Sequence, residues 1–233
     1  SVEGLQLNKK ILITIIVILA VSIAGTVVFY ALFVNNSTST PKGTMVLQSG
    51  VTGMNVAILG PEETLKTGVT EDNGEITFTG LPDGEYQAIA TKEGYSNYYV
   101  LSTSINHGGR TTVQIYMTAV PEQDLLHLST NPNAVIIKQG SSGTVTATAT
   151  SLNDYVGEVS LSCNQLVLPS GVTAAFNPES GSVTAGGKVS STLTLTVSST
   201  ATRGIYQVYI DLSYEQGTSG GEIGGYGLLL QVS

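Results

Sequence analysis

Residues 67–95 read TGVTEDNGEITFTGLPDGEYQAIATKEGY, and this stretch decides the fold of the first half of the chain. It contains two short alternating or apolar runs, EITFTG (75–80) and EYQAIAT (85–91), of the kind that form β-strands. The segments EDNGE and LPDGE supply Asn, Asp, Pro and Gly, the residues that tight turns require. The stretch therefore predicts strands joined by tight turns.

The same pattern extends over residues 45–120. Four more runs of this kind are MVLQ, MNVAIL, YYVLSTSI and TTVQIYMTAV, and the turn-forming segments SGVTG and NHGGR lie between some of them. Strands at a spacing of roughly ten residues are typical of a small β-sandwich. We therefore expect a sandwich over residues 45–121.

This first sandwich resembles the carboxypeptidase regulatory-like, or CnaB-like, β-sandwich. The resemblance implies a structural or adhesive module rather than a catalytic one. It rests on Thr70 to Gly74, Ile76, Phe78, the pattern Leu81-Pro82-x-Gly84-x-Tyr86, and Gly94-Tyr95.

The second half, residues 122–233, also predicts a β-sandwich, and Pro121 to Asp124 mark the expected boundary. Its alternating runs are GTVTATATS, GEVSLSC, STLTLTVSS, IYQVYIDLSY and GYGLLLQVS. It resembles the Ig-like repeats of prokaryotic, often archaeal, cell-surface proteins through the run LPSGVTAAFNP (168–178) and the pattern Ala201-x-x-Gly204-x-Tyr206. We expect the last strand, residues 225–232, to close a sheet edge within the chain, and the alternative is pairing with a neighbouring subunit.

Residues 11–34 read ILITIIVILAVSIAGTVVFYALFV, without a charge or a proline. As a helix this segment would span roughly 36 Å, more than the ~30 Å hydrocarbon core of a bilayer. We expect a hydrophobic transmembrane or filament-core helix over residues 1–36 and a polar linker over 37–44. Ala20, Ala24 and Gly25 form a small-residue patch for close helix approach. The predicted fold class is thus mainly β, with an N-terminal hydrophobic α-helix followed by two tandem Ig-like β-sandwich domains.

Lys9 and Lys10 precede the apolar stretch, and no basic residue follows it before Lys42. The positive-inside rule then places the N-terminus in the cytoplasm and the sandwiches outside the cell. Asn35 and Asn36 each begin an N-x-[ST] sequon, so both are candidate N-glycosylation sites of an expected glycoprotein.

A long apolar N-terminal helix before an exported β-sandwich resembles the type IV pilin superfamily, including archaeal pilins and archaellins. The resemblance implies a helical homopolymer whose helices bundle in the filament core after release from the membrane. Residues 1–10 are more polar than the family pattern. Pairing of Glu3 with Lys9 or Lys10 of a neighbouring subunit would offset the cost of burying those charges. Ser1 is open to two origins, cleavage by a prepilin peptidase or removal of an initiator methionine.

Composition narrows the remaining function classes. The chain of 233 residues has a net charge of −8 and one cysteine, so a disulfide framework and a multi-cysteine metal site are excluded. An acidic chain without basic clusters is a poor candidate for nucleic-acid binding. Phosphate-loop, dinucleotide, GxSxG and HExxH motifs do not occur in the sequence. We expect neither an enzyme nor a cofactor.

Individual reactive residues also favour structural roles. His107 lies in a glycine turn and His127 at the start of a domain, each without a partner at metal-ligand spacing. Cys163 is expected to act as a small apolar residue. The loop Glu71–Glu75 is better read as a tight turn than as a calcium site. A Lys–Asn isopeptide bond, which some CnaB-type domains form, is a further alternative that we disfavour. The candidate side chains for it are Lys42, Lys66, Lys92, Asn97 and Asn106.

Tyr95, Tyr98 and Tyr99 form the candidate adhesive surface, because exposed tyrosines bind glycans and proteins. The favoured alternative is that some of them pack within the sandwich. The sequence thus predicts an extracellular filament subunit with surface-exposed sandwiches, and the alternative is a single-pass membrane-anchored surface binding protein. The expected partners are copies of the chain, the cytoplasmic membrane before assembly, and a glycan or other cell-surface ligand.

Overall fold

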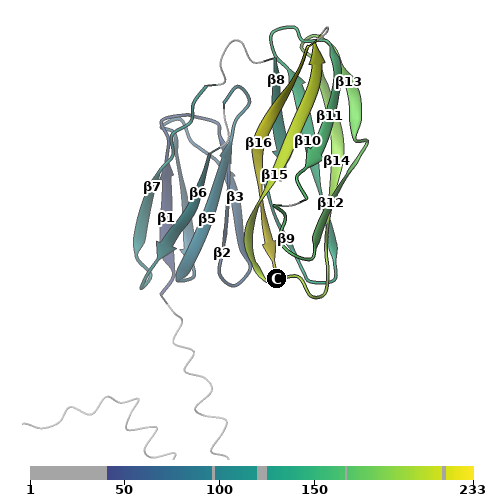
Figure 1. The fold of residues 1–233 in the computed structure, drawn as a ribbon. Coiled ribbons are helices and arrows are strands. Elements are labelled where there is room, and N and C mark those ends of the chain that lie inside the picture. Colours follow the sequence, from purple (N-terminus) through teal and green to yellow (C-terminus); the bar gives the residue numbers. More distant parts are fainter. Residues whose placement is uncertain (1–40, 96–97, 120–124, 166, 217–218) are drawn as a thin grey trace, which may run out of the picture. The chain divides into compact units, whose positions relative to one another are not determined.

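The fold is described from a computed structural model that places residues 41–95, 98–119, 125–165, 167–216 and 219–233 (Figure 1). Residues 40–233 cluster as one compact unit. Within the described ranges the chain forms sixteen β-strands joined by turns and loops. These ranges contain no helix, and hence no helix that could cross a membrane.

The predicted fold class is therefore corrected: the described chain is all β, not β with an N-terminal helix. The physical reason is that apolar and polar residues alternate with a period of two along most runs of the described sequence, and turn-forming residues lie between the runs. The helix expected at 1–36, the start of the linker up to residue 40 and the boundary residues 121–124 lie outside the described residues.

The first sandwich consists of a three-stranded and a four-stranded sheet (purple to teal in Figure 1). In the first sheet the order is β4-β1-β7, with β1 antiparallel to β4 and parallel to β7. In the second sheet the order is β3-β2-β5-β6, with antiparallel pairs throughout. The strands are β1 (Gly43–Gln48), β2 (Asn55–Gly60), β3 (Thr64–Val69), β4 (Glu75–Leu81), β5 (Gly84–Thr91), β6 (Tyr98–Ile105) and β7 (Arg110–Gln114).

The second sandwich consists of a four-stranded and a five-stranded sheet (green to yellow in Figure 1). Their orders are β12-β14-β10-β8 and β13-β11-β15-β16-β9, and β9 runs parallel to β16. The strands are β8 (Leu126–Asn131), β9 (Ala134–Ile137), β10 (Ser142–Ser151), β11 (Gly157–Cys163), β12 (Val172–Asn177), β13 (Ser180–Val183), β14 (Lys188–Val197), β15 (Gly204–Gln216) and β16 (Ser219–Val232). The last strand pairs with β15 and β9, which confirms that it closes within the chain.

Each sandwich has its own apolar core between its two sheets. The first core includes Met45, Val56, Ile58, Phe78 and Tyr86, and the second includes Leu128, Val145, Leu161, Leu193 and Leu228. Alternate residues along β14 follow this rule closely, since Leu193, Leu195 and Val197 are buried while the threonines between them are more exposed. Period-two burial is what a strand with one face on the core requires.

Two strands depart from the alternation because both of their faces are buried. In β2, Val56 and Ile58 point into the first core, while Ala57 and Leu59 belong to a third apolar cluster. In β16, Leu228 and Leu230 point into the second core, while Leu229 belongs to that third cluster. The third cluster is thus made by the outer faces of the two sandwiches, and it also contains Ile89 and Ala134, with Ile136 and Ile205 packed against it.

Polar contacts flank this apolar contact between the sandwiches. The Gln231 side-chain amide donates a hydrogen bond of 3.1 Å to the Gly60 carbonyl. Lys188 forms an ion pair of 2.8 Å with Glu93, and both side chains are more than half exposed. Exposed ion pairs contribute little, so the apolar cluster is the main source of stability between the sandwiches.

Candidate functional site

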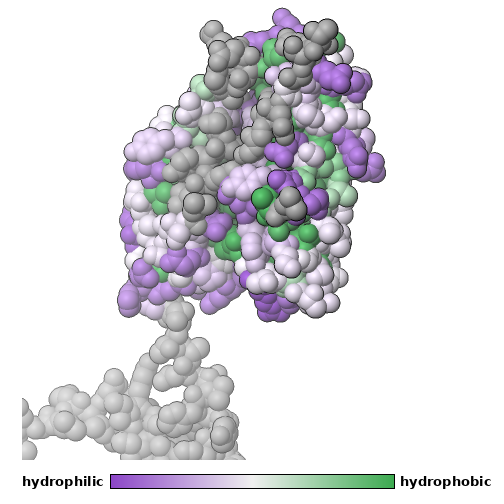
Figure 2. Space-filling model, viewed as in Figure 1, coloured by the Kyte–Doolittle hydropathy of each residue, from purple (hydrophilic) through white to green (hydrophobic). Residues whose placement is uncertain are grey.

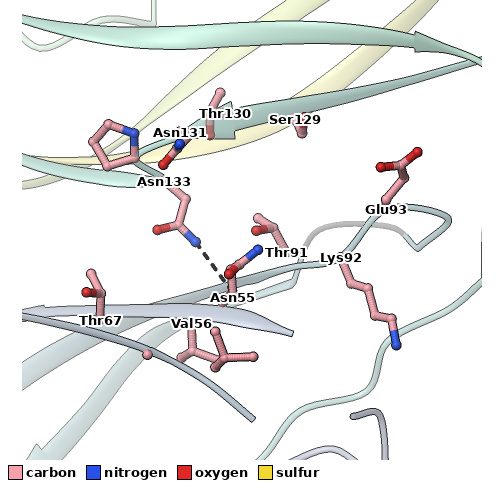
Figure 3. A pocket seen from close by; sticks show the side chains of 13 residues that line it. Asn55, Val56, Thr67, Thr91, Lys92, Glu93, Ser129, Thr130, Asn131 and Asn133 are labelled. Atoms are coloured by element: carbon pink, nitrogen blue, oxygen red, sulfur yellow. Dashed lines mark hydrogen bonds between the residues drawn. The ribbon is translucent and has the colours of Figure 1, made fainter. Parts of the chain in front are cut away.

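A cleft opens beside the apolar cluster, between the edge of the first sandwich and strand β8 of the second (Figure 3). Its volume is roughly 470 Å³. Ligand pockets in proteins commonly measure about 300–1,000 Å³, so the cleft is large enough for a small ligand. It is lined by Asn55, Val56, Thr67, Gly68, Val69, Thr91, Lys92, Glu93, Ser129, Thr130, Asn131, Pro132 and Asn133.

Strand register explains why polar side chains gather on the first wall. Asn55 of β2 lies opposite Val69 of β3 on one side and Thr91 of β5 on the other. Two residues further along β2, Ala57 lies opposite Thr67. Because side chains alternate along a strand, these residues share the outer face of the sheet with Ala57, which is part of the apolar cluster. The outer face is therefore apolar at its centre and polar toward the cleft.

The second wall comes from the end of β8 and the turn that follows it. Leu126 and Leu128 point into the second core. Because side chains alternate along a strand, Ser129 and Asn131 face outward. After the turn, the backbone carbonyl of Asn133 accepts a hydrogen bond of 3.1 Å from the Leu229 N–H group. This bond fixes the backbone of Asn133 next to β16.

The Asn133 side chain reaches across the cleft toward β2 (Figure 3). Its amide nitrogen lies 3.5 Å from the Asn55 carbonyl oxygen, a long hydrogen bond, and the residue is 7% exposed. The Asn133 side chain therefore connects the two walls of the cleft.

The two charged lining residues are already engaged. The Lys92 ammonium donates a hydrogen bond of 2.6 Å to the Thr52 carbonyl and lies 5.4 Å from the centre of the Tyr95 ring. Glu93 pairs with Lys188. Because the Lys92 side chain points away from the other lining residues (Figure 3), the cleft presents mainly amides and hydroxyls.

His127 is buried on β8, near the cleft. Its Nδ1 lies 3.4 Å from the Tyr226 hydroxyl, and its Nε2 has no hydrogen-bond partner among the described residues. Burial lowers the pKa of His127; Glu93 opposes this shift, and Lys188 adds to it. The imidazole is therefore held neutral by its surroundings.

The structure places only part of the predicted adhesive surface. Tyr95 is half-buried, forms an isolated antiparallel β-bridge with Ala119, and its ring lies under the Lys92 ammonium. Tyr98 and Tyr99 are described only as backbone positions of β6. The predicted assembly and glycosylation residues lie outside the described residues, namely Glu3, Lys9, Lys10, Ala20, Ala24, Gly25, Asn35 and Asn36.

The other residues considered for chemical roles in the sequence analysis make local contacts. His107 is an exposed turn residue whose backbone N–H donates to Asp83, and the Asn106 side chain donates to Ser104. Burial raises the pKa of Cys163 to about 12, and the Asp211 carboxylate adds to the shift. Within the described ranges, no three His, Cys, Asp or Glu side chains are grouped so that they could hold a metal ion.

Among the described residues, the exposed apolar side chains do not suggest a second candidate site. On the face shown in Figure 2, hydrophobic residues of the described chain form small patches among polar ones. Large apolar side chains such as Tyr116, 75% exposed, and Val156, 67% exposed, lie on separate segments. Isolated exposed apolar side chains are ordinary on protein surfaces.

No protein-family model matches the sequence, and no curated protein matches it. Among solved structures, the chain is similar to the major pilin subunit BcpA of Bacillus cereus, at 12% identity and a TM-score of 0.32, covering 82% of this chain and 70% of that one. It is also similar to domains 4 and 5 of the S-layer protein SbsC, at 13% identity and a TM-score of 0.27, covering 76% and 75%.

A third similarity is to a putative carbohydrate binding protein from Bacteroides uniformis, at 10% identity and a TM-score of 0.28, covering 82% of this chain and 99% of that one. These neighbours include two kinds of cell-surface protein, a pilin and an S-layer protein. Similarities at these scores establish neither a shared function nor a shared assembly.

Proposed function

We propose that this chain is a structural subunit of an extracellular surface assembly, in its most specific form a type IV pilus-like filament. In this proposal copies of the chain form a homopolymer, and residues 40–233 make up its exposed outer part. The subunit is held in the cytoplasmic membrane before assembly. The role requires no catalytic step and no cofactor.

The observation that carries the proposal is the apolar contact between the sandwiches. Ala57, Leu59 and Leu229 are at most 1% exposed, although they lie on the outer faces of their sheets. A contact of this kind fixes one sandwich against the other. Regular assemblies require each copy to present the same surfaces, so a fixed two-sandwich unit suits a repeating subunit better than two freely tethered domains would.

The sequence of the first 34 residues supports the same proposal. Residues 11–34 carry no charge, whereas the chain from residue 35 onward holds sixteen acidic against seven basic residues. A long uncharged segment can be solvated by lipid before assembly and by copies of itself afterwards. The acidic, hydroxyl-rich remainder is suited to an aqueous exterior.

Electron microscopy of material sheared from cells, with mass spectrometry of the same fraction, tests the proposal. We expect filaments that contain this chain and are missing from a strain that lacks its gene. Recovery of the chain only from the detergent-extracted membrane fraction would contradict the filament and support the membrane-anchored alternative.

A further inference from the structure

We propose that the cleft between the two sandwiches binds an uncharged saccharide. This inference goes beyond the structural role proposed above and does not depend on it, because the cleft is a property of the folded unit 40–233. It assigns ligand binding to residues other than the tyrosines of the predicted adhesive surface.

The hydrogen-bonding chemistry of the lining matches sugar hydroxyls. Each sugar hydroxyl is both a donor and an acceptor, and so are the side chains of asparagine, serine and threonine. The first wall offers Asn55, Thr67 and Thr91, and the second offers Ser129 and Asn131. The two walls face each other in Figure 3, so a ligand that spans the cleft would contact both.

Charge favours a neutral ligand over an ion. Lys92 and Glu93 both have partners outside the lining, the Thr52 carbonyl and the Lys188 ammonium respectively. A cationic ligand would have to displace Lys188 from Glu93. An anionic ligand would have to draw the Lys92 ammonium from the Thr52 carbonyl, since the Lys92 side chain points away from the other lining residues (Figure 3). A neutral polyhydroxylated ligand pays neither cost.

The buried Asn133 amide adds a specific anchor. Its side-chain nitrogen carries two N–H groups, and its contact to the Asn55 carbonyl oxygen is long at 3.5 Å. A buried polar group is stabilised when it gains a hydrogen bond. A sugar hydroxyl that accepts a hydrogen bond from this nitrogen would add to that long contact.

Val69 adds an apolar contact to the lining, which also contains Val56 and Pro132. Val69 is 54% exposed although it lies on the same sheet face as Asn55. Sugar rings carry C–H groups on their faces, and these pack against apolar side chains once the hydroxyls are bound.

Saturation-transfer NMR on the full chain tests the proposal. The protein is kept in a micelle of a detergent without a sugar headgroup, since a glycosidic detergent would compete. The neutral probes are methyl glycosides of glucose, mannose and galactose, N-acetylglucosamine, and cellobiose. Glucuronate and protonated glucosamine serve as charged analogues of the same ring.

The matched variants compare threonines on two edge strands. Thr67→Val removes a cleft hydroxyl from β3, and Thr173→Val removes an exposed hydroxyl from β12, which contributes nothing to the cleft lining. The double variant Asn55→Ala/Thr67→Val removes two polar groups from one wall. Ser129→Ala tests the opposite wall independently, should the double variant fail to fold.

We expect saturable binding of at least one neutral probe, weakened about tenfold or more by the double variant and unchanged by Thr173→Val. Ser129→Ala should weaken it as well. The proposal would be overturned if none of the neutral probes showed saturable binding. It would also be overturned if the cleft variants bound a probe as tightly as the unmodified protein, or if a charged analogue bound more tightly than the neutral probes. Filament formation is scored separately by microscopy, so failure of the saccharide site and failure of the filament proposal are distinguishable.

Discussion

The hydroxyl of Tyr86 donates a hydrogen bond of 2.7 Å to the carbonyl of Pro82, four residues upstream. Tyr206 repeats the arrangement in the second sandwich, with a bond of 3.0 Å to the carbonyl of Thr202. In both cases a glycine with positive φ, the first being Gly84 at 135°, lies two residues before the tyrosine. This is the tyrosine corner of Ig-like sandwiches, and it explains the Gly-x-Tyr pattern shared by the two halves of the sequence.

Replacing Tyr86 by phenylalanine should destabilise the protein by about 1–3 kcal/mol, because the Pro82 carbonyl would lose its donor in a buried position. Tyr86 is fully buried, whereas Tyr206 is only half-buried. Water can replace the hydroxyl at the second corner, so Tyr206→Phe should cost less. Urea denaturation of both variants measures the difference, and equal losses would contradict the role of burial.

His127 should make the protein less stable in acid. Its pKa is lowered in the folded state by burial, so the unfolded chain binds a proton more readily below the ordinary value of 6.5. The stability contributed by the neutral imidazole is therefore present above pH 6.5 and lost as the pH falls through the folded-state value. Thermal unfolding at a series of pH values measures this loss.

The variant His127→Phe should flatten that pH dependence below pH 6.5. It retains an aromatic ring for the edge-on contact with Tyr226, in which the ring centres lie 5.6 Å apart. His107→Asn is the matched control, since residue 107 is an exposed turn position with φ of 52°, which asparagine tolerates. An equal change in slope for the two variants would contradict the assignment to His127.

Leu229→Ala should destabilise the protein by about 2–5 kcal/mol although residue 229 faces away from both sandwich cores. The loss should extend to the first sandwich, because Leu229 packs in one cluster with Leu59. Hydrogen exchange of the β2 amides detects that spread. Leu65→Ala, at a position 38% exposed on β3, serves as the control and should leave exchange in β16 unchanged.

Cys163 should resist alkylation in the folded protein. With its pKa raised to about 12, the thiolate fraction at pH 8 is on the order of one in ten thousand. Iodoacetamide labelling followed by mass spectrometry should therefore be slow in buffer and fast in urea. Comparable rates in the two conditions would show that the thiol is accessible and unperturbed.

Much of the β architecture could be predicted from local sequence. The runs EITFTG and EYQAIAT coincide with β4 and β5, because alternation and turn residues act over only a few positions. The helix expected at residues 1–36 has no counterpart in the described chain, which is all β. The period-two alternation of apolar residues does not predict which strands pair. The parallel pairing of β1 with β7, for example, depends on residues far apart in sequence.

The cleft could not be predicted from the sequence. Its polar residues occur singly, as in Asn55 and Ser129, and each resembles an ordinary exposed position of a strand. One signal was available: the runs VAIL at 56–59 and LLL at 228–230 do not alternate, which is typical of strands buried on both faces. That signal indicates a second packing surface on each strand, but only the fold shows that the two surfaces meet.

The parallel pairing of β1 with β7, and of β9 with β16, has a mechanical consequence. In each sandwich a strand near the start of the domain lies parallel to the last strand. The N-terminal end of the early strand and the C-terminal end of the last strand therefore lie at opposite ends of the paired strands. Tension along the chain would load the evenly spaced hydrogen bonds of each pair together, in shear, instead of breaking them one after another. Both sandwiches are thus built to resist stretching along the chain.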